Sequence, residues 1–285
     1  MGQAGAFAQN IRIDMNQTYP EKTINLQKVA DVKYIPLETT DEVLFNGIVT
    51  NLSAEGIAGF NKKEGDILVF DGTGKAIASF NHTGQGPNEY NKIYHLDVDW
   101  KQKEVYVQDN FRQKIRIYGF DGRHLRTIDL QEIMQEGDLY SFSDTHLIYY
   151  AKPKSKPVTA YEPVTLLSKK DASKVTLPFT KTDDNLVKAT GGPFGDMKMS
   201  AKNVNLLCKK GDEVYVNEVT ADVIYRVESN HALTPVVERT PSYQDASGQD
   251  FFLMLTGANA RYYFFKRQQA LLEFQGNAAT DTKST

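Results

Sequence analysis

Short apolar runs rich in Val, Ile, Tyr and Phe alternate with Gly-, Asp- and Asn-containing turns along most of this sequence. The clearest series lies in the first half of the chain. Its four runs are Tyr94–Trp100, Glu104–Asp109, Lys114–Phe120 and His124–Leu130. Four β-rich runs separated by short turns predict one four-stranded antiparallel sheet.

The same pattern recurs along the chain. Asp66–Phe70 and Lys75–Phe80 flank the turn Asp71–Gly74 and predict a hairpin. Equivalent positions at Ile67, Ile115, Val164 and Val223 recur about every 50 residues, which is typical of β-propeller blades. Two aromatic-rich runs, Phe251–Leu255 and Arg261–Phe265, follow the fourth repeat. The pattern therefore predicts an all-β fold, a β-propeller of four-stranded antiparallel blades, with four blades and the start of a fifth.

Other segments depart from the repeat. Residues 1–20 are small and polar and are expected to be poorly ordered, with a single propeller domain over residues 21–285. Thr23–Leu26 and Val32–Leu37 are predicted to be strands, the second at a sheet edge because it contains a proline. The Gly-, Asp- and Lys-rich stretch Lys181–Ser200 predicts a loop on one rim. Gln268–Phe274 fits either a strand or a short helix.

Composition narrows the range of partners. The chain has 285 residues and a formal net charge of −3, so it lacks the basic field that recruits nucleic acid or an anionic membrane. No run of about 18 apolar residues occurs, and we therefore predict no transmembrane segment. Cys208 is the single cysteine, which excludes a disulfide within the chain. Its apolar neighbours predict a buried, unreactive thiol.

The N-terminus contains an Ala-x-Ala pattern in Gly5–Asn10, as at the cleavage end of an export signal. This is either the remnant of such a signal or a chance Ala-rich start. We favour export, to the periplasm or the cell surface.

The densest turn chemistry lies in Gly84-Gln85-Gly86-Pro87-Asn88-Glu89-Tyr90. Its glycines would let a ligand approach the backbone, so Gln85, Glu89 and Tyr90 are candidate ligand-binding residues. Alternatively the stretch is the crossover between two blades, with Gly and Pro supplying turn geometry. We favour the crossover. Arg112 is a further candidate, either facing a central channel to bind an anion or lying in a solvated loop.

His95, Asp97 and Asp99 alternate along one predicted strand and therefore share a face. Such a group could hold a metal or perform acid–base chemistry, but a structural role for Asp99, fixing the following turn, is favoured. The remaining histidines are scattered, and no sequence motif of a nucleophilic or metal-dependent hydrolase occurs. We predict no catalytic residue, no metal and no cofactor.

Two stretches carry a family resemblance. Gly84–Tyr90, followed by Leu96–Asp99, Val105–Asp109 and Ile115–Tyr118, resembles an NHL-type propeller repeat. With Tyr34–Thr40, it is similar to the exported six-bladed β-propeller proteins abundant in gut bacteria, most of which have no assigned activity. The resemblance implies six blades, and we therefore expect this sequence to be a truncated member that lacks the last blade and most of its export signal.

Three functional hypotheses follow, because propellers host many activities. The favoured one is a non-enzymatic extracytoplasmic module that binds a peptide, glycan or protein ligand. An NHL-like lyase or hydrolase with a metal at the central channel is the second. The third is a structural subunit of a cell-surface assembly.

Overall fold

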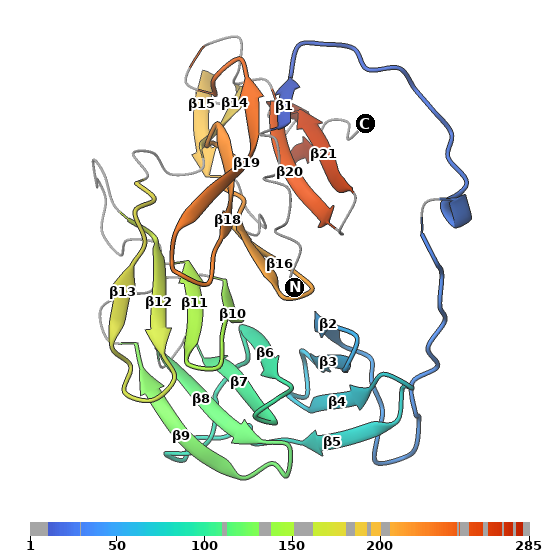
Figure 1. Cartoon of the computed structure of the whole chain (residues 1–285), viewed down its shortest axis with the longest axis vertical. Coiled ribbons are helices and arrows are strands. Elements are labelled where there is room, and N and C mark those ends of the chain that lie inside the picture. The colour runs from blue at the N-terminus through green and yellow to red at the C-terminus, as the bar shows by residue number, and fades with distance from the viewer. Residues whose placement is uncertain are drawn as a thin grey trace, which may run out of the picture. The chain divides into compact units, whose positions relative to one another are not determined.

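In the computed structural model, the regular secondary structure of the described residues is almost wholly β (Figure 1). The described residues are 11–28, 30–109, 113–130, 138–150, 162–180, 186–192, 195–200, 206–243, 245, 251–258, 262–269, 271–275 and 278–281. The helical structure among them is one 3-10 turn, η1 (Leu26–Lys28). The chain forms two compact units. Unit 1 comprises Met1–Thr18, Pro157–Val164 and Leu177–Thr285, and unit 2 comprises Tyr19–Lys156 and Thr165–Thr176.

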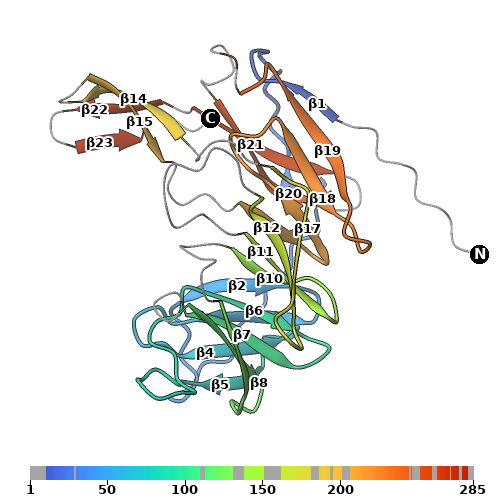
Figure 2. The same cartoon turned by 90° about the vertical axis from the view of Figure 1, so that its left-hand side faces the viewer.

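Unit 2 is built from three successive four-stranded sheets (Figure 2). The first sheet contains β2 (Ile48–Leu52), β3 (Gly56–Phe60), β4 (Ile67–Asp71) and β5 (Ala76–Phe80). The second contains β6 (His95–Asp99), β7 (Glu104–Asp109), β8 (Lys114–Gly119) and β9 (His124–Asp129). The third contains β10 (Leu139–Ser141), β11 (His146–Tyr150), β12 (Val164–Ser168) and β13 (Lys174–Thr176). Each sheet follows chain order, so the predicted repeat of four-stranded sheets is confirmed.

Burial explains why the middle strands are continuous apolar runs. Every residue of β3 and β7 is buried, because other sheets or segments cover both faces of these strands. Side chains of the first and second sheets meet in one cluster that includes Phe60, Val69, Leu96 and Val107. The outer strand β9 instead alternates between more and less exposed positions. Neighbouring sheets therefore pack face to face, and the outer strand β9 meets solvent on one side.

The predicted hairpin turns are confirmed. In the β4–β5 turn, Asp71 Oδ1 accepts hydrogen bonds from the backbone N–H groups of Thr73 and Lys75, at 2.8 and 3.1 Å. The hydrogen bond from the Thr73 hydroxyl and these backbone bonds lower the pKa of Asp71. Gly74 has a φ of 91°, a conformation that favours glycine. Asp121 fixes the β8–β9 turn in a similar way, by accepting a bond from Arg123 N.

The segment before β2 corrects two predictions. Val32–Leu37 pairs with no strand; instead Ile35 and Leu37 pack against a buried cluster of the first sheet, and Glu38 N donates to Gly74 O at 2.8 Å. Pro36 has no backbone N–H group to donate, and the segment packs on the face of the sheet instead of pairing with a strand. Thr23–Leu26 is also not a strand, because Asn25 Oδ1 accepts a bond from Gln27 N at the start of η1.

Unit 1 contains a five-stranded sheet, a mixed four-stranded sheet and a hairpin. The first is β1 (Ile11–Asp14), β19 (Leu233–Thr240), β18 (Val223–Val227), β17 (Glu213–Val216) and β16 (Leu207–Lys210), in that order. The mixed sheet is β15 (Gly195–Ser200), β14 (Leu186–Gly192), β22 (Leu271–Gln275) and β23 (Ala278–Asp281). The hairpin is β20 (Phe251–Ala258) and β21 (Tyr263–Gln269). The strands predicted for the fourth repeat pair with one another as β16 to β19, and the two aromatic runs pair as β20 and β21.

Two features of unit 1 differ from the sequence expectation. The predicted rim loop Lys181–Ser200 contains the paired strands β14 and β15, although residues 181–185 lie outside the described residues. The prediction was wrong because β14 also pairs with β22, about 80 residues later, and no local pattern reveals such a partner. Ile11–Asp14, within the segment expected to be poorly ordered, forms β1 and pairs in parallel with β19.

Candidate functional site

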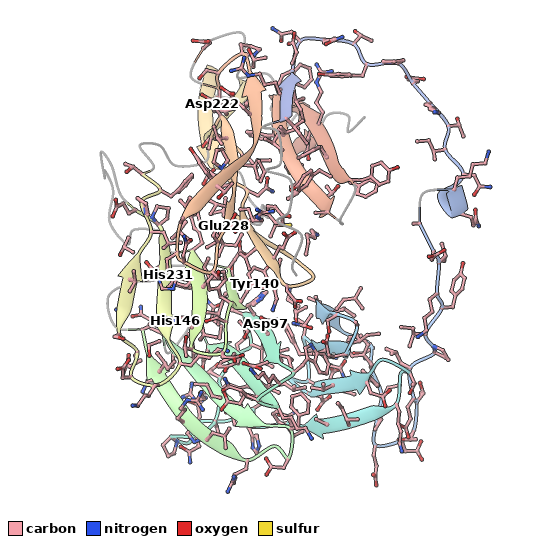
Figure 3. All side chains as sticks on the ribbon, in the orientation of Figure 1. Asp97, Tyr140, His146, Asp222, Glu228 and His231 are labelled. Carbon is pink, nitrogen blue, oxygen red and sulfur yellow. The ribbon has the colours of Figure 1, made fainter. Side chains whose placement is uncertain are left out.

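The first strands of the three sheets in unit 2 bring polar side chains together. Asn51 on β2 donates from Nδ2 to Asp97 Oδ1 on β6 at 2.5 Å. The other carboxylate oxygen, Oδ2, accepts a bond from the backbone N–H of Ser141 on β10 at 2.5 Å. Figure 3 labels Asp97 and its neighbour in this region, Tyr140, whose ring meets the His95 imidazole edge-on at 5.1 Å. Asp97 is fully buried, and these two hydrogen bonds offset part of the free energy needed to remove its carboxylate from water.

Asp99 lies two residues further along β6 and joins the second and third sheets. Its Oδ1 accepts a bond from Gln102 N at 3.0 Å, which fixes the β6–β7 turn as the sequence suggested. Its Oδ2 pairs with Lys169 Nζ at 2.5 Å. The same ammonium donates to Ser141 Oγ at 2.9 Å and to Ser143 O at 2.6 Å. All three donors of the Lys169 ammonium therefore have acceptors.

Glu104 is the third buried carboxylate of this region. Arg126 donates to its two carboxylate oxygens, from Nη1 to Oε1 at 2.6 Å and from Nη2 to Oε2 at 2.8 Å, and Tyr106 donates to Oε2 at 2.6 Å. Burial raises the pKa of Glu104, but the bonds from Arg126 and Tyr106 outweigh burial and lower the pKa overall. In unit 1, Tyr215 donates to Glu213 in the same way at 2.6 Å. The repeated Glu-Val-Tyr-Val tetrapeptide thus encodes a tyrosine whose hydroxyl has an acceptor two residues earlier.

These contacts limit the chemistry of the inner strands. The carboxylates of Asp97, Asp99 and Glu104 accept bonds from amide, ammonium and guanidinium groups of the protein itself. Within the described ranges, no three His, Cys, Asp or Glu side chains are grouped closely enough to hold a metal ion. The arrangement is that of a structural polar network connecting three sheets.

The Gly84–Tyr90 loop connects β5 to β6, so the predicted crossover between two sheets is confirmed. Its shape depends on Glu89, whose Oε2 accepts a bond from Gly86 N at 2.7 Å. A Cβ atom on residue 84 would lie 2.0 Å from the same oxygen. Gly84 is therefore required for the carboxylate to lie inside the loop. Figure 2 shows the strands that this loop connects.

Tyr90 anchors the loop to the first sheet. Its ring is fully buried, and its hydroxyl accepts a bond from His82 N at 2.9 Å and donates to Gly65 O at 2.8 Å. Burial raises the pKa of this phenol to about 12. The hydroxyl is therefore a neutral hydrogen-bonding group at ordinary pH.

The second sheet holds the other side of the loop. Asp109 Oδ2 accepts a bond from Asn91 N at 2.8 Å and pairs with Arg116 Nη1 at 3.2 Å, in an ion pair that is 1% exposed or less on both sides. Tyr118 donates to Asn88 O at 2.7 Å, and its ring stacks on His82 at 5.1 Å. The loop is therefore fixed at both of its ends.

The candidate residues predicted from the sequence differ in their exposure and in their contacts with the loop. Gln85 is exposed near the tip of the loop, Glu89 points into the loop, and Tyr90 lies beneath it. Arg112 lies outside the described residues. Sequence reasoning missed Asn51, Lys169 and Arg126, whose partners lie 22 to 70 residues away.

The chain belongs to a family described as "Domain of unknown function (DUF4934)", which matches residues 10–239. Among curated proteins, none gives a significant match. Among the described residues, no helix has the length and hydrophobicity that a membrane span requires.

Two solved structures share the overall fold of this chain with TM-scores above 0.5, and a third is less similar. A Bacteroides fragilis protein inferred to be exported is 13% identical, with 92% of this chain and 77% of that chain covered and a TM-score of 0.57. A member of the DUF4221 family from Bacteroides vulgatus is 9% identical, with coverage of 86% and 76% and a TM-score of 0.51. The β-propeller domain of Cps50 (Swd1) from Myceliophteria thermophila is 11% identical over 82% and 92%, with a TM-score of 0.38. Its successive four-stranded antiparallel sheets make the protein an all-β, propeller-like member of its family.

Replacing Tyr90 by phenylalanine tests the anchor of the loop. We expect the free energy of unfolding to fall by about 1–3 kcal/mol, because His82 N loses its acceptor and Gly65 O its donor in a buried place. Tyr34→Phe is the matched control, since Tyr34 is 90% exposed. Urea unfolding of both variants provides the measurement. Equal stabilities for the two variants would contradict the anchoring role.

Proposed function

We propose that this protein is a non-enzymatic, exported binding module that holds a peptide, glycan or protein ligand on the surface formed by the loop between β5 and β6. The observation that carries the proposal is the construction of this loop. Buried anchors on two sheets fix its backbone, while Gln85 near its tip remains exposed. Rigid placement of an exposed polar side chain lowers the entropy cost of binding.

The alternation of strands adds a second argument. β3 and β5 run in the same direction in the first sheet, so the connections that follow them lie at the same end of that sheet. These connections are residues 61–66, between β3 and β4, and residues 81–94, between β5 and β6. Connections at the opposite ends, such as 53–55, 72–75 and 100–103, are shorter turns. Binding residues concentrate on longer loops that a rigid scaffold positions.

Within this proposal the four candidate residues have different roles. Gln85 contacts the ligand, whereas Glu89 and Tyr90 maintain the shape of the loop. Arg112 contributes a positive charge to an anionic part of the ligand. The proposal assigns no role to a metal or a cofactor, and the three inner carboxylates accept bonds from protein donors.

The proposal also includes the finer features of the architecture and location. A single domain over residues 21–285, with NHL-like blades from a six-bladed ring, is supported by the four-stranded sheets that recur in chain order. Export to the periplasm or cell surface is supported by the description of the Bacteroides fragilis protein.

A binding screen with the purified full chain tests this function. Peptide and glycan arrays identify a ligand, and calorimetry then compares the wild type with Gln85→Ala. We expect at least a ~10-fold loss of affinity, equivalent to about 1.4 kcal/mol. Gln17→Ala, an exposed glutamine of unit 1, is the control and should bind like the wild type.

Two results would count against the proposal. Equal affinity of Gln85→Ala and the wild type for every ligand found would remove the loop from the binding surface. A stoichiometric bound metal together with turnover of a ligand would instead favour the lyase or hydrolase hypothesis.

A further inference from the structure

A histidine at the start of the loop 81–94 connects this loop to the second sheet. His82 Nε2 lies 2.7 Å from the carbonyl oxygen of Gly122, in the turn between β8 and β9. A carbonyl oxygen only accepts hydrogen bonds, so this nitrogen carries the hydrogen and donates it. The backbone of His82 also holds the anchor of the loop, because Tyr90 N donates to His82 O at 3.0 Å. His82 therefore joins the loop to the β8–β9 turn.

Two imidazole rings pack against one buried phenol at this junction. The ring of His82 stacks on that of Tyr118, with centroids 5.1 Å apart and 9° between the planes. His124, the first residue of β9, meets the same phenol edge-on at 5.6 Å. Tyr118 is fully buried and donates to Asn88 O at 2.7 Å, so it is one of the contacts that hold the loop. The docked loop thus brings a second titratable ring close to His124.

The groups around His124 do little to stabilise a positive charge on its ring. Arg116, on the neighbouring strand β8, is 1% exposed and itself carries a positive charge. The carboxylate of Asp109 is bonded to this guanidinium, and that of Glu89 accepts a bond from a glycine inside the loop. Nε2 of His124 lies 2.9 Å from the hydroxyl oxygen of Thr127, which is neutral. A protonated His124 would therefore lie beside a cation and a second histidine.

Other charged groups on the same elements are paired with one another or exposed. The pairs are Asp121 with Arg123, Lys114 with Asp129, and Arg126 with Glu104, and Lys92 of the loop is exposed. These groups leave the positive charge of Arg116 as the main one that faces His124 in the docked state.

This environment makes docking of the loop depend on pH. Burial, Arg116 and His82, in that order, lower the pKa of His124 from its ordinary value of about 6.5. When the loop leaves the sheet, the imidazole gains water and moves away from His82, so its pKa rises toward the ordinary value. As the pH falls below about 6.5, the undocked state therefore takes up a proton that the docked state resists, and docking weakens.

We propose that His82, Tyr118 and His124 form a pH-sensitive latch, which holds the loop 81–94 on the second sheet near neutral pH and releases it in mildly acidic solution. The latch is a property of the fold and does not depend on whether the loop binds a ligand. Ligand binding through Gln85 would weaken over the same pH range, and this corollary alone rests on the function proposed above.

Hydrogen exchange of single backbone amides in the full chain, followed by NMR, measures docking of the loop. Gly84 N donates to Tyr90 O at 3.0 Å, so this amide reports opening of the loop. Between about pH 7.5 and about pH 5.5, we expect its protection factor, corrected for the intrinsic exchange rate, to fall by about 3–10-fold. Ten-fold is the limit because one histidine that titrates near 6.5 in the open state gains about one logarithmic unit of proton binding over this range. The amide of Val107, in the buried strand β7, should change less, since it reports opening of the sheet.

Two variants identify the group responsible. His124→Gln removes the titrating ring and keeps a side chain that can bond to the hydroxyl of Thr127, so the fall at Gly84 should shrink to less than ~2-fold. His146→Gln changes a histidine of the third sheet and should behave like the wild type. A wild-type protection factor at Gly84 that does not change with pH would overturn the proposal, as would an equal fall in folded His124→Gln.

Direct titration of the His124 ring by NMR needs no variant. We expect a midpoint below the ordinary value of about 6.5, and an upward shift of that midpoint in His82→Gln, which lacks the neighbouring imidazole. A wild-type midpoint at or above the ordinary value would also overturn the latch. Failure of Gln85→Ala to alter ligand binding, with the pH response of Gly84 intact, would count against the proposed function alone.

Discussion

Replacing Lys169 by methionine is expected to lower the free energy of unfolding by about 3–5 kcal/mol. The lysine and Asp99 are both buried, and their side chains are 4% and 8% exposed. Without the ammonium, Asp99 keeps a buried charge with no cation beside it, and Ser143 O loses a donor. Urea unfolding followed by tryptophan fluorescence measures the loss, because Trp100 follows Asp99 directly.

Lys101→Met provides the matched control. Lys101 pairs with Asp144, but the two side chains are 73% and 61% exposed. Exposed pairs contribute about 0–1 kcal/mol, so this variant should be close to the wild type. The double variant Lys169→Met/Asp99→Asn should recover part of the loss, because it removes the uncompensated charge. A cost below about 1 kcal/mol for Lys169→Met alone would show that the buried ion pair does not hold the sheets together.

Replacing Gly59 by alanine is expected to cost about 3 kcal/mol. A Cβ atom at this position would lie 2.3 Å from the carbonyl oxygen of Ile48 and 2.9 Å from Cζ of Phe45. The close approach of Ile48 arises at an irregularity in the β2–β3 pairing, between Val49 and Asn51. Either the two strands must separate or the Phe45 ring must leave the sheet face. Thermal and urea unfolding measure the effect.

Gly86→Ala is the corresponding control in the same unit. The nearest atoms to a Cβ there belong to the flexible side chain of Glu89, at 3.1 Å. We expect this change to cost less than about 1 kcal/mol, because the carboxylate can shift. If both alanine variants were equally stable, the close strand approach at Gly59 would not be a constraint on the fold.

The sequence predicts most of the fold because its strongest signals are local. Runs such as Glu104–Asp109 have high β-propensity and are bounded by turn residues, and their partners are the adjacent runs in the chain. The strand β14 lacks this advantage, since one of its partners is β22. Val32–Leu37 has strand-like composition but packs on the face of a sheet. Composition alone does not distinguish a segment that packs on a sheet from a strand within it.

The candidate site is less predictable from sequence for the same reason. The Gly-Gln-Gly-Pro stretch is recognisable as a turn-rich crossover, and the structure adds that Glu89 and Tyr90 serve the loop itself. Lys169 stands in a Lys-Lys-Asp turn, a composition typical of an exposed turn. Its burial becomes apparent only when the third sheet brings it against Asp99 of the second.

The Asp99–Lys169 contact has a consequence for the family as a whole. The two residues are 70 positions apart, and either one alone would leave a buried charge. Members of the family should therefore change both positions together, to another oppositely charged pair or to two apolar residues. An alignment of the family can reveal such paired change without any experiment on this chain. Paired change at these two positions would show that the second and third repeats evolved together.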